Sequence, residues 1–129
     1  MALKLTTPIQ MRFADIDSFG HVNNIAQQSY FDLGKAEFFA ELWRLAPEQQ
    51  QVTAMIVSVQ NDFLKQILWG DDISVITSIE AVGTKSLTFI QHIVRGEELC
   101  SRSRTVMVCY DRVAQQSVEV PAEWRKEIV

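Results

Sequence analysis

The sequence lacks any apolar run near the ~18 or more residues that a membrane-spanning helix needs, and it contains few cysteines. Its first residues, MALKLTTP, have neither the apolar segment nor the cleavage site of a signal peptide. The two cysteines, Cys100 and Cys109, are too few for a disulfide scaffold. We therefore expect a cytoplasmic protein with reduced thiols and no membrane partner.

Basic residues are also fewer than acidic residues. The chain has 12 Lys and Arg against 16 Asp and Glu, which gives a net charge of −4. Domains that bind nucleic acid usually carry a basic excess, so we expect no nucleic-acid partner. Arg102 and Arg104 share one face of an alternating segment, a pattern typical of a solvated surface.

Two common catalytic patterns are missing. No G-x-S-x-G elbow is present. His21, His92, Cys100 and Cys109 are not spaced as pairs of metal ligands. We therefore expect no metal site and no serine nucleophile. Cys109 lies in an alternating segment, and we expect it to be a small core residue.

The overall composition is that of one globular domain over residues 1–129. Hydrophobic residues make up 47% of the chain and charged residues 22%, the usual balance for a protein that buries a single core.

An alternating segment over residues 8–15 predicts the first strand. Apolar side chains occupy every second position from Ile9 to Phe13, which is the period of a half-buried strand. If the alternation continues, Asp15 and Asp17 fall on the apolar side. A carboxylate there is costly unless it is paired or useful. We expect Asp15 to be structural, as a partner for N–H groups of the turn.

Residues 25–45 predict a long helix. Helix formers dominate the segment, and no proline appears before Pro47. Asn23 or Asn24 is a suitable N-cap. Apolar residues cover well over half of the helix circumference, so we expect most of it to be buried. Gly34, unfavourable inside a helix, predicts a close approach to another backbone.

The rest of the chain predicts an antiparallel sheet. Four further segments alternate with the period of strands: residues 53–64, 72–82, 85–95 and 99–111. Short connections that contain glycine separate them, which favours a meander. The tail VPAEWRKEI predicts a last helical turn. Together these elements predict an α+β domain whose curved antiparallel sheet wraps around one long central helix.

The stretch MRFADIDSFGHVNN resembles the hot-dog fold thioesterases, specifically the 4-hydroxybenzoyl-CoA thioesterase-like group of acyl-CoA hydrolases. The segments YFDLGKAEFF, WGDDISV and GTKSL resemble further motifs of the same family, and the order of elements agrees with its fold. The resemblance covers nearly the whole chain.

This resemblance implies roles for particular residues. Asp17 matches the catalytic aspartate, and Asn24 matches the position whose backbone N–H polarises the thioester carbonyl. Lys85 and Ser86 match positions that contact the phosphate arm of coenzyme A. The family builds its site across a dimer interface, often within a tetramer. The resemblance thus implies a homodimer or homotetramer, with coenzyme A as part of the substrate and no other cofactor.

The chemistry of these residues suits thioester hydrolysis. A helix N-terminus offers unpaired N–H groups and a positive dipole end to the oxygen that becomes negative. Asp17 would act either as a general base for water or as a nucleophile. Ile25 and Tyr30, near the helix start, are candidates to meet the acyl group, and His21 is a further candidate substrate contact.

Other functions remain open at this stage. The same site would hydrolyse acyl groups from acyl carrier protein, and a non-catalytic acyl-binding protein would keep the same fold. The sequence departs from the family pattern at Gln27, Lys35 and Trp69. These departures change the shape and polarity of the pocket, so the resemblance does not assign the acyl group.

Overall fold

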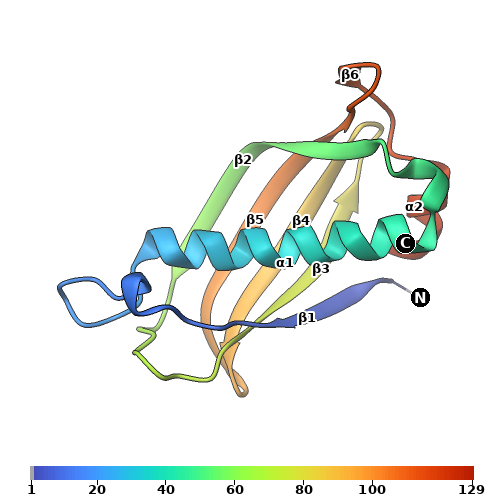
Figure 1. Ribbon diagram of the computed structural model, residues 1–129. Helices are drawn as coiled ribbons and strands as arrows, with labels where there is room; N and C mark the ends of the chain where they lie inside the picture. The colour runs from blue at the N-terminus through green and yellow to red at the C-terminus, as the bar shows by residue number, and fades with distance from the viewer. Residues whose placement is uncertain (1) are drawn as a thin grey trace.

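One long helix lies along an antiparallel sheet in the computed structural model, which describes residues 2–129 (Figure 1). The helices are α1 (Asn24–Leu45) and α2 (Ala122–Ile128). The strands are β1 (Lys4–Pro8), β2 (Val52–Phe63), β3 (Ser74–Val82), β4 (Ser86–Arg95), β5 (Glu98–Asp111) and the short β6 (Gln116–Ser117). The α+β prediction is confirmed. Neither helix is long and apolar enough to cross a membrane, as far as residues 2–129 go.

The strand order in the sheet is β1-β3-β4-β5-β2, with β6 beside the end of β5. The strands β3, β4 and β5 form the predicted meander, but the prediction that β2 belongs to it is wrong. β2 pairs with β5, from Val52 opposite Asp111 to Phe63 opposite Ser101. Alternation identifies a strand but carries no information about its neighbour. Sequential strands pair often but not always.

The first strand is earlier and shorter than predicted. β1 ends at Pro8, and a 3-10 turn occupies Phe13–Asp15. The ring of Phe13 is 80% exposed, whereas Asp15 is only 2% exposed. The Asp15 carboxylate accepts the N–H of Arg12 at 3.0 Å, and this local bond turns the chain out of the sheet.

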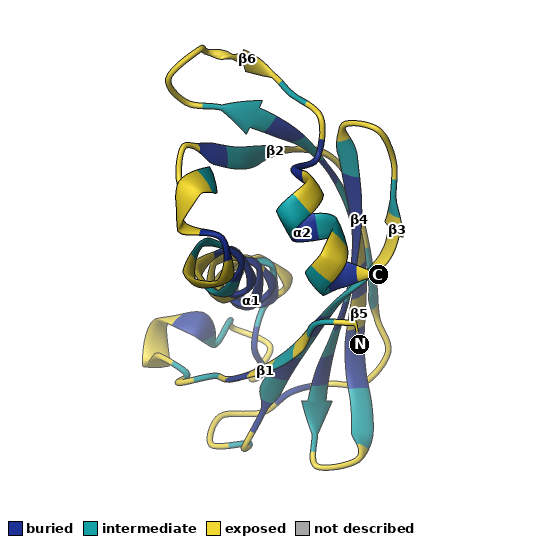
Figure 2. Ribbon diagram, turned by 90° about the vertical axis from the view of Figure 1, so that its right-hand side faces the viewer, coloured by how far each residue is buried: buried dark blue, intermediate teal, exposed yellow. Residues whose placement is uncertain are grey.

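The predicted helix is confirmed almost to the residue, including its cap. The Asn23 side chain accepts the N–H of Ala26 at 2.6 Å. The prediction that most of the circumference of α1 is buried is wrong, since Ile25 is 74% and Leu33 is 44% exposed. Figure 2, a view along α1, shows why, since the sheet curls around only one side of the helix.

The core has two apolar clusters, one at each end of α1. The first joins Phe38 and Leu42 to Trp124 of α2, and the second surrounds Phe31 near the helix start. Buried polar residues of the sheet lie between them: Thr77, Gln91 and Ser103, which are register partners on β3, β4 and β5.

The polar row meets α1 at its one glycine. Gln91 Nε2 donates to the carbonyl of Phe31 at 2.8 Å and to Thr77 Oγ1 at 3.0 Å. A Cβ on Gly34 would lie 2.7 Å from Thr77 Oγ1 and 2.8 Å from Gln91 Nε2. The predicted close approach at Gly34 is confirmed, although side chains rather than backbone atoms fill the contact.

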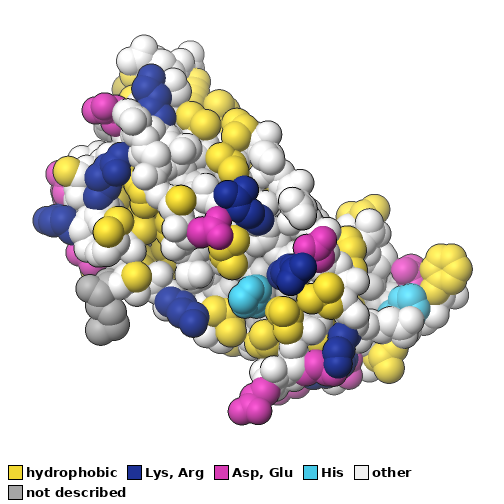
Figure 3. Space-filling model, turned by 180° about the vertical axis from the view of Figure 1, so that it is seen from behind, with side chains coloured by type: hydrophobic (Ala, Val, Ile, Leu, Met, Phe, Trp, Pro, Cys, Tyr) yellow, Lys and Arg dark blue, Asp and Glu magenta, His cyan; other side chains and the backbone are white. Residues whose placement is uncertain are grey.

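The outer face of the sheet, turned away from α1, is a mixed charged surface (Figure 3). Arg102 pairs with Asp62 and Arg104 pairs with Glu80, each at 2.9 Å. These pairs confirm the solvated face expected for the two arginines. His92 lies on this face, and burial together with the nearby Lys4 and Arg102 lowers its pKa.

Candidate active site

A tight loop between the first turn and α1 fixes the position of Asp17. The Asp17 Oδ1 atom accepts the N–H of Phe19 at 2.9 Å, and the Asp17 N–H donates to the carbonyl of His21 at 3.0 Å. Gly20 closes the loop with φ of 93°, a conformation that favours glycine. The second carboxylate oxygen, Oδ2, has no hydrogen-bond donor among residues 2–129.

The start of α1 presents free donors to the same space. The Asn23 cap takes up the N–H of Ala26, and Gln27 N–H bonds to the carbonyl of Asn23 at 3.1 Å. Within residues 2–129, the N–H groups of Asn24 and Ile25 have no acceptor. Two donors at the positive end of a 22-residue helix therefore remain available to an incoming oxygen.

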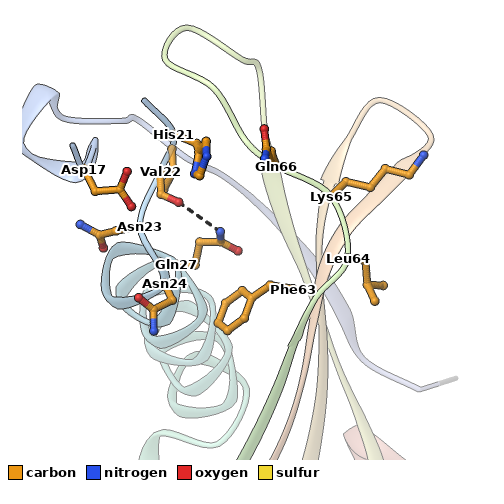
Figure 4. A pocket seen from close by; sticks show the side chains of 10 residues that line it. All are labelled: Asp17, His21, Val22, Asn23, Asn24, Gln27, Phe63, Leu64, Lys65 and Gln66. Carbon is orange, nitrogen blue, oxygen red and sulfur yellow. Dashed lines mark hydrogen bonds between the residues drawn. The ribbon is translucent and has the colours of Figure 1, made fainter. Parts of the chain in front are cut away.

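The loop and the helix start enclose a hollow of about 320 Å³ (Figure 4). We call this space the first hollow. Its lining includes Asp17, His21 and Asn24, together with Gln27, Phe63 and Lys65. The structure thus brings together three of the predicted site residues, and in Figure 4 their side chains surround one opening beside the first turn of α1. A carboxylate and a helix N-terminus share one small space.

Gln27 forms the inner wall of the first hollow. It is 4% exposed, and its Nε2 atom donates to the carbonyl of Val22 at 3.5 Å. Its Oε1 atom accepts the hydroxyl of Ser101. The sequence marked Gln27 only as a departure from the family pattern. The structure shows that both ends of its amide are held, so it is a fixed part of the pocket wall.

The segment after β2 supplies the opposite wall. Phe63, Lys65 and Gln66 line the first hollow, and the N–H of Val22 bonds to the carbonyl of Ile67 at 2.8 Å. Lys65 pairs with Glu98 at 2.8 Å and is 56% exposed at the rim. The sequence did not predict this wall. Its residues have the same alternating pattern as any strand end, and their contact with the helix start joins segments far apart in the chain.

Two predicted contacts near the helix start do not line the first hollow. Ile25 is 74% exposed and points away from it. Tyr30 is 6% exposed, and its hydroxyl donates to Asp15 Oδ2 at 2.6 Å. The expected structural role of Asp15 is confirmed, and Tyr30 supports it.

The Asp15 and Tyr30 pair has shifted pKa values. Burial alone would raise the pKa of Asp15, but hydrogen bonds from Tyr30 and Arg12 and the Arg12 charge outweigh it and lower the pKa. Burial and the bond to Asp15 raise the pKa of Tyr30. Asp15 is therefore a buried, paired carboxylate that anchors the loop carrying Asp17.

Lys85 and Ser86 lie at the other end of the molecule. Lys85 is near Ser117, with Nζ 3.5 Å from Oγ, and Ser86 opens β4 beside α2. The carbonyl of the neighbouring Thr84 accepts the N–H of Val120, which precedes α2. Because α1 separates this end from the first hollow, one chain does not bring these two residues to Asp17.

The cysteines and potential metal ligands form no second centre. Cys109 is fully buried, as expected for a core residue, and burial raises its pKa to about 11. Across residues 2–129, no three His, Cys, Asp or Glu side chains gather as a metal would require.

A curled antiparallel sheet along one long helix is the hot-dog fold. Residues 11–128 match the model of the thioesterase-like superfamily, and the chain belongs to this superfamily.

Three known proteins illustrate the similarity. An uncharacterized protein of Bacillus subtilis strain 168, YsmA, is 27% identical over 123 residues, which cover 94% of this chain and 82% of that protein. A thioesterase from Thermus thermophilus, complexed with coenzyme A and zinc, is 25% identical with a TM-score of 0.80, covering 95% of this chain and 90% of that one. A predicted thioesterase from Bacillus stearothermophilus is 24% identical with a TM-score of 0.81, covering 98% of both chains.

Proposed function

We propose that the protein hydrolyses acyl-CoA thioesters to a free acid and coenzyme A. The observation that carries this proposal is the first hollow, where the Asp17 carboxylate and the free N–H groups at the start of α1 share one opening. The donors would hold the carbonyl oxygen as negative charge develops on it. Losing one such donor typically slows a reaction about 10²–10³-fold.

Asp17 would act on the carbonyl in one of two ways. As a general base, its free Oδ2 takes a proton from water, the hydroxide adds to the carbonyl, and the coenzyme A thiolate leaves. As a nucleophile, it adds to the carbonyl and expels the thiolate, and water then cleaves the resulting anhydride. In a single turnover in ¹⁸O-labelled water, label enters Asp17 only by the second route, when water attacks the aspartyl carbonyl of the anhydride and releases the unlabelled acid. Neither route uses a metal, and we propose that activity survives dialysis against EDTA.

A similar solved structure supports coenzyme A as the leaving group, since the Thermus thermophilus neighbour is complexed with coenzyme A. Lys65 lines the first hollow, although its Nζ atom pairs with Glu98 and points away from the opening (Figure 4). We propose that His21 contacts the substrate from the loop.

We further propose that the functional unit is a homo-oligomer. Lys85 and Ser86 lie too far from Asp17 within one chain, so a contact between them and coenzyme A requires a second copy. The free edge of β2 supports such a contact. This strand has 12 residues and exposes Met55, Val57 and Val59, and within residues 2–129 it pairs only with β5.

The test is release of free coenzyme A thiol across a panel of acyl-CoA substrates. We expect Asp17→Asn to lower kcat at least about 100-fold, because a positioned general base contributes about 10²–10⁴-fold. Asp72→Asn, the same change at an exposed residue outside the first hollow, should match the wild type.

Three outcomes would redirect this proposal. An Asp17→Asn protein as active as the wild type removes the mechanism. If the protein hydrolyses acyl groups from acyl carrier protein faster than from coenzyme A, it is an acyl-carrier-protein thioesterase. Tight acyl-CoA binding by the wild type with no turnover assigns a non-catalytic acyl-binding protein.

A further inference from the structure

Two separate spaces lie between α1 and β2, and the first hollow is one of them. The first hollow joins the helix start, at Asn24 and Gln27, to Phe63 at the end of β2. Further along, Trp43 Nε1 donates to the carbonyl of Val52 at 2.8 Å, so the end of the helix faces the start of the strand. The helix and the strand therefore run side by side in opposite directions.

A second space of about 320 Å³ lies further along α1. We call it the far cleft. Most of its walls are apolar: Ala36, Phe39 and Trp43 from the helix, Ala54 and Ile56 from β2, and Met107 from β5. Asp32, Lys35 and Thr53 complete the lining. Phe39 and Met107 are 6% and 7% exposed, so the floor of the far cleft is the apolar core itself. Nothing in the mechanism above uses this space.

Between the two spaces, one polar contact joins α1 to β2, and two further side chains on α1 extend it to the wall of the far cleft. Asn61 Nδ2 donates to Gln28 Oε1 at 2.6 Å, and Gln28 Nε2 donates to Asp32 Oδ1 at 3.0 Å. Lys35 Nζ donates to the same Asp32 oxygen at 3.3 Å. We call these four residues the latch. Gln28 comes one position after Gln27 of the first hollow, and Asn61 lies between Phe63 and Ile56 on β2.

The polar contacts of the latch carry a cost in folding free energy. Lys35 is 3% exposed, and burial lowers its pKa despite the nearby Asp32. The Asn61 Oδ1 atom is buried and has no hydrogen-bond partner among residues 2–129. Apolar side chains at these positions would avoid both costs. The polar contacts therefore point to a role other than stability.

We propose that the latch limits the length of the acyl chain, and that the far cleft holds the distal part of long chains when the latch opens. The proposal rests on the acyl-CoA thioesterase function given above. From Asn24 to Gln28 the helix rises about 6 Å, and an extended chain advances about 1.2 Å per bond. An acyl group in the first hollow thus meets the latch after about five bonds. A chain that reaches Ala36 must pass about 18 Å along α1.

The experiment compares kcat/KM for butanoyl-CoA and hexadecanoyl-CoA, whose extended acyl chain reaches about 18 Å. We expect the wild type to favour butanoyl-CoA at least 10-fold. Asn61→Ala and Gln28→Ala each remove the 2.6 Å bond and should raise the ratio of hexadecanoyl to butanoyl turnover at least 10-fold. Gln60→Ala, the neighbouring change on β2 outside both spaces, should keep the wild-type ratio.

A second experiment fills the far cleft with a larger side chain. Ala36→Phe in the Asn61→Ala background should abolish the gain for hexadecanoyl-CoA and leave butanoyl-CoA unchanged. Because Gln28 is on the helix surface, its variant tests the same bond if Asn61→Ala does not fold, as judged by thermal melting.

The outcomes separate this proposal from the proposed function. A wild type that hydrolyses both substrates equally, or folded variants with the wild-type ratio, overturns the role of the latch and leaves the thioesterase intact. A wild type without turnover of any acyl-CoA removes both.

Discussion

At the scale of single residues, two aspartates one position apart have opposite environments. Asp15 is 2% exposed and is held by Arg12 and Tyr30. Asp17 borders the first hollow with one carboxylate oxygen free of protein donors in residues 2–129. The buried carboxylate anchors the loop, and the free one is available to a substrate.

Removing the Tyr30 hydroxyl should weaken this anchor. We expect Tyr30→Phe to lower the free energy of unfolding by about 1–3 kcal/mol at pH 7, because a buried carboxylate loses a hydrogen bond. The lowered pKa of Asp15 contributes stability that is present above its ordinary value of 3.8 and is lost as the pH falls through the folded value. The difference between variant and wild type should therefore shrink below about pH 4.

Urea unfolding at pH 7 and pH 3 measures this difference. Tyr110→Phe is the matched control, since no hydrogen bond holds the Tyr110 hydroxyl within the described chain, and it should change stability little. A Tyr30→Phe protein as stable as this control at pH 7 would show that the anchor contributes nothing.

At the scale of elements, α1 approaches the sheet most closely at Gly34. Overpacking there typically costs about 1–3 kcal/mol, whereas replacing glycine in a helix gains about 1 kcal/mol at most. We expect Gly34→Ala to be destabilising by about 1–2 kcal/mol in thermal or urea unfolding, because the new Cβ would lie 2.7 Å from Thr77 Oγ1.

A larger side chain distinguishes crowding from helix propensity. Alanine and leucine are both strong helix formers, so propensity alone predicts that either stabilises the helix. Crowding predicts that Gly34→Leu loses far more than Gly34→Ala, while Ala40→Leu on the exposed face of α1 is tolerated. Equal stability of the two Gly34 variants would contradict the close approach as the cause.

At the scale of the whole molecule, the sheet has an open edge that a second copy would cover. A lysine at Val57, which is 59% exposed on β2, would place a charge in that contact. We expect Val57→Lys to convert an oligomeric wild type to a monomer in size exclusion with light scattering, and to lower thiol release with it.

A second exposed valine provides the control for charge alone. Val113 is 77% exposed beyond the end of β5, and Val113→Lys should leave the oligomer and its activity intact. A fully active monomeric wild type would rule out a site that draws Lys85 and Ser86 from a second copy.

Local patterning was enough to predict most of the helix and strand positions. Helix-forming residues, the lack of proline before Pro47 and an asparagine cap located α1 almost to the residue, and alternation located β2 to β5, because these signals lie within a few neighbouring residues. The stretch DIDSFGHVNN marked the loop and the helix start that border the first hollow.

Which elements contact one another depends on the folded chain. It placed β2 on the far edge beside β5, turned Phe13 outward, and brought Lys65 and Gln66 to the helix start. It also separated Lys85 from Asp17 and joined Gln28 to Asn61 across 33 positions of the chain. These contacts depend on burial and hydrogen bonding between distant segments, which local periodicity does not encode.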